Sequence, residues 1–271
     1  MNRLADRVLI VTGSTGIAAA SAHRFAAEGG AVFVTSRTES HCRELADSIS
    51  AAGGQVGFKA AELTDETQVG AAVAACVETF GRIDGVFSVA GGSGRRFGDG
   101  PIHEMTGEGW DRTLELNLRS QALVCREVVL RLLDQAPTAS GSRGSILLTS
   151  SVLAFHPVPE LFATHAYAAA KGAIVSLATT MAAAYAPMGI RVNVVAPSLT
   201  ATPMAQRAAT DPATIEFARR KQPLVGGFLD PDEVAQAAVY FLSDESRAVT
   251  GQLLKIDGGW SVTASAAVAV P

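Results

Sequence analysis

A phenol and an ammonium group stand four residues apart in the segment Tyr-Ala-Ala-Ala-Lys, at Tyr167 and Lys171. Side chains at positions i and i+4 lie on the same face of a helix, so we expect these two groups to be neighbours. A tyrosine with its ordinary pKa of about 10 is a poor general base at neutral pH. A nearby cation lowers that pKa by roughly 1 to 3 units. The pair therefore predicts a tyrosine that serves as a general acid or base.

Hydroxyl and amide groups that would assist such a tyrosine occur earlier in the chain. Ser150 and Ser151 follow an apolar run of strand length, where a hydroxyl can hold a substrate oxygen by hydrogen bonding. Asn117 interrupts an apolar helical pattern, and we expect its amide to bind a water molecule that relays protons to Lys171. The alternative for Asn117 is a buried amide that is satisfied by the chain itself.

A glycine turn follows the first apolar run, in Thr12-Gly13-Ser14-Thr15-Gly16-Ile17-Ala18-Ala19. Glycines let the backbone turn tightly and approach a diphosphate, which the unpaired N–H groups of a following helix stabilise. The strict G-x-G-x-x-G pattern is absent, because alanines stand where a third glycine is expected. The turn predicts a dinucleotide site, and a plain strand-to-helix turn is the alternative.

The residues after the second apolar run bear on the choice of dinucleotide. An NAD site usually carries Asp or Glu about 20 residues after the turn, to hold the ribose hydroxyls. Here the residues are Ser36 and Arg37. Because a guanidinium suits a 2′-phosphate, NADP(H) is favoured over NAD(H). The alternative is a solvated Arg37, with Glu39 or another group on the ribose.

Further segments are candidates for the substrate cleft. The glycine-rich stretch 91–100 does not open into a helix, and we expect it to form a mobile wall of the cleft, with anion binding by Arg95 and Arg96 as an additional hypothesis. Six residues are expected to form an apolar pocket wall: Phe155, Val158, Leu161, Phe162, Met204 and Phe217. Such a wall is compatible with an acyl thioester, a ring ketone or a polyketide-like carbonyl.

The elements that must position these groups alternate along the chain. We expect strands at residues 8–11, 32–35, 56–59, 86–89, 146–149, 192–195 and 253–256. We expect helices at residues 18–28, 40–51, 66–80, 110–133, 167–186 and 232–242. The alternation predicts an α/β fold with a doubly wound, Rossmann-like parallel sheet, in one domain over residues 1–271 with a C-terminal tail at 261–271. Ligands are then expected at the carboxyl ends of the strands.

Composition narrows the function classes. The 271 residues are 48% hydrophobic and 18% charged, which suits a folded globular chain, and the net charge of −4 argues against nucleic acid as a partner. The three cysteines form no CxxC spacing, and no signal peptide is visible, so we expect a cytoplasmic location. The uncharged stretch 172–190 predicts a buried helix face rather than a membrane span. The five histidines show no paired ligand spacing, so no metal is expected.

Taken together, these residues resemble the short-chain dehydrogenase/reductase family in its compact single-domain form, from about residue 7 to residue 260. The matching pieces are the glycine turn, Asn117, Ser151, Tyr167 with Lys171, Arg191-Val-Asn-Val-Val-Ala-Pro197, Thr202, and Thr250-Gly251-Gln252 leading to Asp257-Gly258-Gly259. The resemblance implies that Tyr167 exchanges the hydroxyl proton of the substrate and that Lys171 also binds the nicotinamide ribose. It further implies that Ser151 orients the substrate oxygen and that Asn117 supports a water relay.

The expected cofactor contacts follow from the same resemblance. They are Gly13, Ser14, Thr15, Gly16, Ile17, Ser36, Arg37, Glu62, Leu63, Ala90, Gly91, Tyr167, Lys171, Pro197, Thr200 and Thr202. The implied activity is hydride transfer between NADP(H) and a small-molecule carbonyl or secondary alcohol, with reduction as the favoured direction. The implied assembly is a homo-oligomer, a tetramer or a dimer.

The chain also departs from the family pattern. The glycine turn is one residue shorter than Thr-Gly-x-x-x-Gly-x-Gly, and the family's Asn-Asn-Ala-Gly reads Ser88-Val89-Ala90-Gly91. Ser198 stands where glycine is usual, and the 16 positions from Ser151 to Tyr167 exceed the usual spacing by about three. These departures motivate a second hypothesis, a catalytically silent dinucleotide-binding sensor or scaffold. The retained Tyr167 and Lys171 argue for the enzyme.

Overall fold

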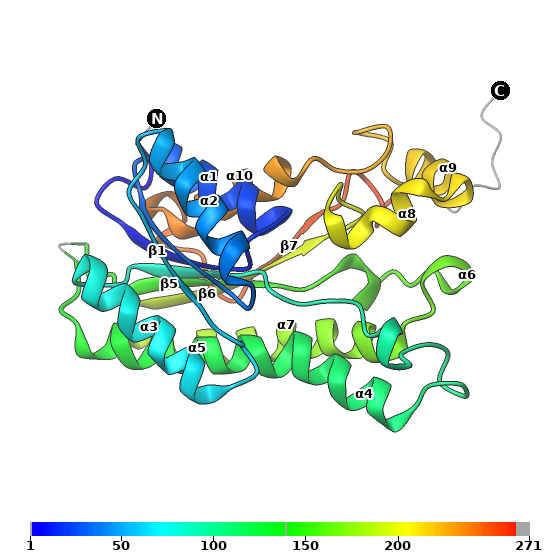
Figure 1. Cartoon of the computed structure of the whole chain (residues 1–271), viewed down its shortest axis with the longest axis horizontal. Helices are drawn as coiled ribbons and strands as arrows, with labels where there is room; N and C mark the ends of the chain where they lie inside the picture. The colour runs from blue at the N-terminus through cyan, green and yellow to red at the C-terminus, as the bar shows by residue number, and fades with distance from the viewer. Residues whose placement is uncertain (1, 139, 264–271) are drawn as a thin grey trace.

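The computed structural model describes residues 2–138 and 140–263, and seven parallel strands form one sheet in this part of the chain (Figure 1). The strands are β1 (Val8–Thr12), β2 (Ala31–Ser36), β3 (Val56–Ala60), β4 (Gly85–Ser88), β5 (Gly144–Thr149), β6 (Ile190–Pro197) and β7 (Leu253–Ile256). Their order across the sheet is β3-β2-β1-β4-β5-β6-β7. The predicted doubly wound parallel sheet is confirmed, and its strand order reverses between β1 and β4, where such folds bind ligands.

Helices cover both faces of the sheet (Figure 1). One face carries α1 (Ile17–Ala27), α2 (Glu39–Ala51) and α10 (Pro231–Leu242), and the other carries α3 (Glu66–Phe80), α5 (Ser120–Asp134) and α7 (His165–Tyr185). Successive side chains of β1 enter the two cores in turn: Leu9 and Val11 pack on the first face, Val8 and Ile10 on the second. Burial on both faces explains why the strands are continuous apolar runs.

The prediction of a single helix over residues 110–133 is wrong. The structure has α4 (Gly107–Leu114), a π-helical turn (Glu115–Arg119) and then α5. Polar side chains compete for the helix carbonyls at this point, since Thr113 donates its hydroxyl to the Gly109 carbonyl and Asn117 donates its amide to the Thr113 carbonyl. Side chains that bond helix carbonyls often bend a helix, and π-helical turns within α-helices are frequent at functional sites.

Two other boundaries differ from the expectation. The strand predicted over residues 86–89 ends at Ser88, because the Val89 N–H is donated to the Thr12 hydroxyl instead of to a neighbouring strand. The short helices α6 (Pro159–Phe162), α8 (Gln206–Thr210) and α9 (Pro212–Lys221) were not expected. Figure 1 shows α8 and α9 together at the upper right of the view.

The end of the described chain packs against α9. The Lys221 ammonium donates to the Thr263 carbonyl at 2.7 Å. Of the tail expected at 261–271, residues 264–271 lie outside the described part. No helix in residues 2–138 and 140–263 is long and apolar enough to cross a membrane.

Candidate active site

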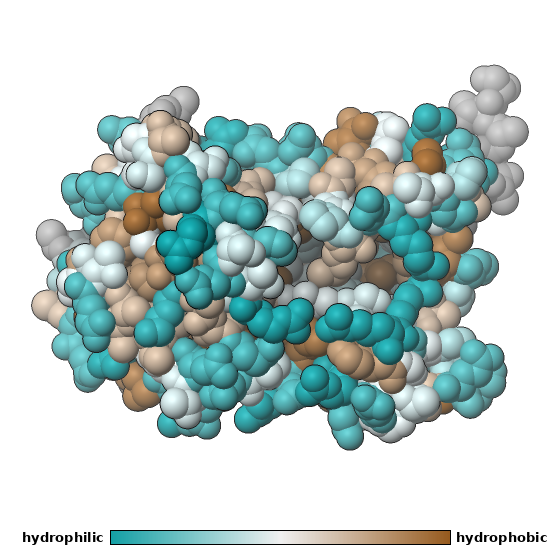
Figure 2. Space-filling view, in the orientation of Figure 1, coloured by the Kyte–Doolittle hydropathy of each residue, from teal (hydrophilic) through white to brown (hydrophobic). Residues whose placement is uncertain are grey.

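A cleft of about 870 Å³ lies at the carboxyl ends of the central strands. Its lining comes from the segments that follow β1, β2, β3, β4, β5 and β6, together with α7. Figure 2 shows the surface hollowed near the centre of this view, with hydrophobic residues inside and hydrophilic residues on the rim. All the predicted catalytic and cofactor-contact residues line this one cleft.

The glycine turn at the end of β1 requires both of its glycines. Gly13 has φ +102° and Gly16 has φ +56°, which L side chains rarely adopt. A Cβ on Gly13 would lie 2.9 Å from the Ala18 side chain, and one on Gly16 would lie 2.8 Å from the Thr202 methyl. Gly16 is the N-cap of α1, so this bare backbone stands at a helix N-terminus. The geometry suits the close approach of an anionic diphosphate.

The departure at Ser88-Val89-Ala90-Gly91 is compensated by a side chain of β1. The Thr12 hydroxyl accepts the N–H groups of Val89 and Ala90 at 2.9 and 3.0 Å. This buried hydroxyl joins the ends of β1 and β4 where the strand order reverses. The turn beside the cleft therefore remains braced without the family's two amides.

The ends of β2 and β3 form the basic end of the cleft. The Ser36 hydroxyl hydrogen-bonds the Ser14 hydroxyl at 2.9 Å, which ties β2 to the glycine turn. The Arg37 guanidinium lies 3.9 Å from the Glu62 carboxylate, and both side chains are largely exposed, 64% and 39%. An exposed ion pair of this length contributes little, so the guanidinium can rearrange toward another anion. Thr38 and His41, which were not predicted, line the cleft here.

Lys171 is buried in the N-terminal third of α7. Its ammonium donates to the Thr149 carbonyl at 2.9 Å, at the end of β5, and lies 5.5 Å from the centre of the Tyr167 ring. Burial lowers the pKa of Lys171 to about 7, because the charged form loses its hydration. The predicted face-sharing of Tyr167 and Lys171 on one helix is thus present in the fold.

Tyr167 faces Ser151 across the cleft. Burial raises the pKa of Tyr167 above its ordinary value, and a hydrogen bond with the Ser151 side chain opposes that shift. We expected Lys171 to lower this pKa, and the net direction in the structure is the opposite, because burial outweighs the hydrogen bond. A phenol in this state keeps its proton at neutral pH.

The two tandem serines have different partners. The Ser150 hydroxyl donates to the Lys171 carbonyl at 2.7 Å, which attaches β5 to α7. The Ser151 hydroxyl accepts the Leu153 N–H at 3.3 Å and interacts with Tyr167. Only Ser151 is therefore placed to contact a substrate oxygen beside the phenol.

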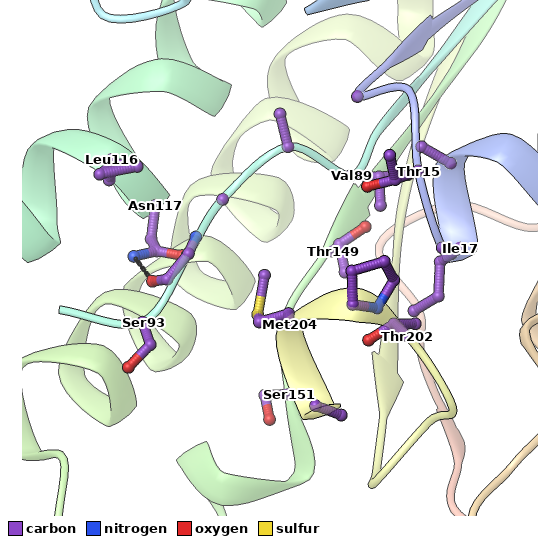
Figure 3. Close-up of a pocket in the computed structure, with 18 of the residues that line it drawn as sticks. Thr15, Ile17, Val89, Ser93, Leu116, Asn117, Thr149, Ser151, Thr202 and Met204 are labelled. Carbon is purple, nitrogen blue, oxygen red and sulfur yellow. Dashed lines mark hydrogen bonds between the residues drawn. The ribbon is translucent and has the colours of Figure 1, made fainter. Parts of the chain in front are cut away.

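Asn117 lies in the π-helical turn and is fully buried. Its amide nitrogen donates to the Gly92 and Thr113 carbonyls, both at 2.9 Å, and its amide oxygen accepts the Gly92 N–H at 3.1 Å. Figure 3 shows Asn117 directed at the loop that carries Ser93, with a hydrogen bond between the residues drawn as a dashed line. These contacts hold the loop after β4 in place, and the water relay through Asn117 stays a prediction.

A buried carboxylate that the sequence analysis missed holds the first turn of α7. Asp99 accepts the N–H groups of Ala166 and Tyr167 at 3.0 and 3.1 Å. Thr164, the local N-cap of α7, makes no side-chain cap hydrogen bond, so Asp99 caps the helix from a distant loop. Asp99 thereby fixes the backbone that carries the Tyr167 phenol.

Comparison with known proteins agrees with this geometry. A family model described as enoyl-(acyl carrier protein) reductase matches residues 11–261. A "short-chain type dehydrogenase/reductase" from Mycobacterium ulcerans has a similar structure, with a TM-score of 0.87, 27% identity, and coverage of 96% of this chain and 91% of that one. The chain belongs to the short-chain dehydrogenase/reductase family.

Curated relatives match over nearly their whole length. The "A-factor type gamma-butyrolactone 1'-reductase (1S-forming)" of Streptomyces virginiae is 35% identical, covering 96% of this chain and 97% of that protein. The "Cis-4-hydroxycyclohexanecarboxylate dehydrogenase" of Sinomonas cyclohexanicum is 34% identical, covering 95% and 97%. This member of the family is therefore an NAD(P)-dependent oxidoreductase that acts on alcohol or carbonyl groups.

The substrate end of this short-chain dehydrogenase/reductase differs in part from the expectation. Phe162 and Met204 line the cleft, but Phe155, Val158, Leu161 and Phe217 do not. Phe217 packs edge-on against Trp260 at 5.0 Å, and Trp260 itself forms the wall. Leu153 and Arg207 also line the cleft without having been predicted.

The wall at residues 91–100 is confirmed in part. Gly91, Gly92, Ser93, Arg95 and Arg96 line the cleft. The expected mobility finds no support in the hydrogen bonds, because Asp99 is tied to α7 and the Arg95 guanidinium donates to the Leu161 carbonyl at 3.0 Å. Among the residues that the structure describes, no group of three or more His, Cys, Asp or Glu could hold a metal ion.

Proposed function

We propose that the protein is an NADP(H)-dependent reductase of ketones, with Tyr167 as the general acid. The observation that carries the proposal is the convergence of three groups in one cleft. The Ser151 side chain interacts with the phenol and lowers its pKa, and the Lys171 ammonium lies 5.5 Å from the centre of the phenol ring. This arrangement places a proton donor and a hydroxyl together where one carbonyl oxygen can meet both.

The chain offers a fitting site for the dinucleotide at the other end of the cleft. Gly13 and Gly16 let the backbone turn tightly at the N-terminus of α1, where a Cβ would strike Ala18 or Thr202. The segment from Pro197 to Thr202 crosses beside Gly16 and would hold the nicotinamide end, and Lys171 would hold its ribose. The bound cofactor supplies the hydride, and the protein supplies the proton and the orientation.

The protonation state of Tyr167 favours reduction. Burial raises its pKa, so the phenol holds a proton at neutral pH and can donate it to a carbonyl oxygen as the alcohol forms. The Ser151 hydroxyl would donate to the same carbonyl oxygen and orient it. The Thr149 carbonyl anchors the Lys171 ammonium next to the phenol.

Arg37 supports the choice of NADP(H). The cleft-lining residues immediately after β2 are Arg37, Thr38 and His41, and none of them is acidic. A 2′-phosphate would meet a guanidinium whose present partner, Glu62, is exposed and 3.9 Å distant. A charge-assisted, bidentate contact with phosphate is stronger than that ion pair.

The relatives suggest the substrate class. One is named as a reductase of a gamma-butyrolactone and another as a dehydrogenase of a hydroxycyclohexanecarboxylate. The cleft here has an apolar wall of Leu153, Phe162, Met204 and Trp260. We propose a ketone on or beside a small ring as the substrate.

Turnover and binding measured together test this function. The purified protein is titrated with NADPH and NADH by calorimetry and then assayed with NADPH against a panel of cyclic and acyl ketones. We expect tighter binding of NADPH and NADPH oxidation that depends on a ketone. A protein that binds NADPH tightly but oxidises none across the panel would contradict the proposed reductase and favour a silent binder.

A further inference from the structure

Three arginines line the substrate half of the cleft without a carboxylate partner. Arg95 and Arg96 follow β4, and Arg207 lies on α8, after β6. In the part of the chain that the structure describes, none of the three forms an ion pair within 4.0 Å. Arg37, at the opposite end, does have such a partner in Glu62.

Two of these charges repel each other. Burial is the largest cause that lowers the pKa of Arg95, the nearby Arg207 charge lowers it further, and Asp99 opposes both. The Asp99 carboxylate is already occupied by the N–H groups of Ala166 and Tyr167. Asp211 interacts electrostatically with Arg207 from outside the cleft, and no carboxylate among the described residues forms an ion pair with either guanidinium. Two neighbouring cations that line a cleft attract an anionic ligand.

The Arg95 guanidinium is held in place by the chain. One nitrogen, Nη2, donates to the Leu161 carbonyl at 3.0 Å, in the segment between β5 and α7. A guanidinium has five N–H donors, so the others remain for a ligand. The same loop continues to Asp99, which caps the helix of Tyr167, so Arg95 and the phenol are positioned by one folded segment.

The phosphates of the dinucleotide would bind at the other half of the sheet, and its nicotinamide end would reach the segment from Pro197 to Thr202. The glycine turn and Arg37 follow β1 and β2, whereas Arg95 and Arg207 follow β4 and β6, beyond the point where the strand order reverses. Figure 3 shows Met204, two residues after Thr202, between Asn117 and Thr202 in this view of the cavity. The phosphates of the cofactor thus have partners that do not include Arg95 or Arg207.

We propose that Arg95 and Arg207 bind a carboxylate group of the substrate while its ketone or hydroxyl meets Tyr167. The proposal deepens the proposed reductase and rests on it for the reacting end. The carbon skeleton between the two ends would contact Phe162, Met204 and Trp260. The substrate class is accordingly a keto acid or hydroxy acid with a compact apolar body.

Matched acids and amides test the anion site. The 3- and 4-oxocyclohexanecarboxylates and their primary amides are titrated by calorimetry into the protein saturated with NADP⁺, which cannot reduce them. We expect each acid to bind at least about tenfold more tightly than its amide, the range for a charge-assisted hydrogen bond. Arg95→Gln and Arg207→Gln should each remove most of that preference and leave amide binding unchanged. Arg219→Gln removes an exposed charge on α9, outside the cleft, and should change nothing.

Three results would overturn the anion site. The first is that the wild type binds acid and amide equally well, or binds neither. The second is a preference for the acid that survives both cleft substitutions. The third is a loss of NADP⁺ affinity in Arg207→Gln, which would assign that arginine to the cofactor. Turnover of the same compounds with NADPH is measured separately. An acid preference without turnover keeps the anion site and contradicts the reductase, whereas turnover of acid and amide at equal rates keeps the reductase and contradicts the anion site.

Discussion

Arg37 is the residue on which the choice of cofactor depends. Arg37→Ala should weaken NADPH binding by at least about tenfold and leave NADH binding little changed, because only NADPH carries the 2′-phosphate. Calorimetric titration of both cofactors against both proteins measures this. Arg43→Ala is the matched control, since Arg43 pairs with Glu39 on α2 and does not line the cleft. Equal losses for both cofactors would assign Arg37 to loop support, and tighter NADH binding by the wild type would overturn the NADP(H) assignment.

Lys171 makes the stability of the protein depend on pH. Its folded pKa of about 7 lies below the unfolded value of about 10.4, so between these values the unfolded chain binds more protons. The free energy of unfolding should therefore rise with pH in this window, by up to about 1.4 kcal/mol per unit, and level off above it. Lys171→Met removes this contribution while other titrations remain.

Urea unfolding of both proteins at pH 7, 8 and 9 isolates the contribution of the lysine. The difference in free energy of unfolding, wild type minus Lys171→Met, should increase with pH. A difference that stays constant over these three values would show that the buried ammonium keeps its ordinary pKa.

At the scale of the elements, α7 depends on a cap from another loop. Asp99→Asn should lower kcat by at least about tenfold with little change in the KM for NADPH, because the substitution weakens the hold on the first turn that carries Tyr167. Loss of a cap typically costs about 1 kcal/mol of stability. Asp65→Asn, which weakens the cap of the remote α3 helix, should cost a similar stability without the loss of kcat. Steady-state kinetics and urea unfolding of both variants separate the two effects, and equal kinetics would contradict a positioning role for Asp99.

The strands and most helices could be predicted because a buried parallel sheet requires continuous apolar runs, and helices on its faces require an apolar period. The interruption at Asn117 could not, since it arises from side chains that bond helix carbonyls, which periodicity does not register. Helices α8 and α9 are short and polar, so they lack the pattern on which helix prediction depends.

In the candidate site too, some residues could be predicted from local sequence and others only from the fold. Tyr167, Lys171, Ser151 and the glycine turn were predictable because each carries its chemistry in a local spacing or at a strand end. Asp99 acts on a helix 67 residues later, and Arg207 meets Arg95 only through the fold, so neither leaves a local signal. The direction of the pKa shift of Tyr167 could not be predicted from the sequence either, since burial and not the cation at i+4 sets that direction.

At the scale of the whole molecule, we predict a homo-oligomer, most simply a tetramer. Large apolar side chains are exposed on α4 and α5: Trp110 is 37% exposed, Leu130 48% and Leu133 38%. Contact with a second copy would remove this apolar surface from water. Light scattering at micromolar concentration should give a mass near a multiple of 28.0 kDa, and a mass near 28.0 kDa itself would contradict the prediction.

The central claim is that the cleft is a working proton-transfer site and not only a dinucleotide site. Tyr167→Phe tests it most directly, because the substitution removes the hydroxyl and keeps the ring. The measurement is kcat with NADPH and a ketone that the wild type reduces, alongside the Kd for NADPH. The account predicts a loss of about 10² to 10⁴-fold in kcat with the Kd nearly unchanged. Turnover by Tyr167→Phe within about tenfold of the wild type would contradict it.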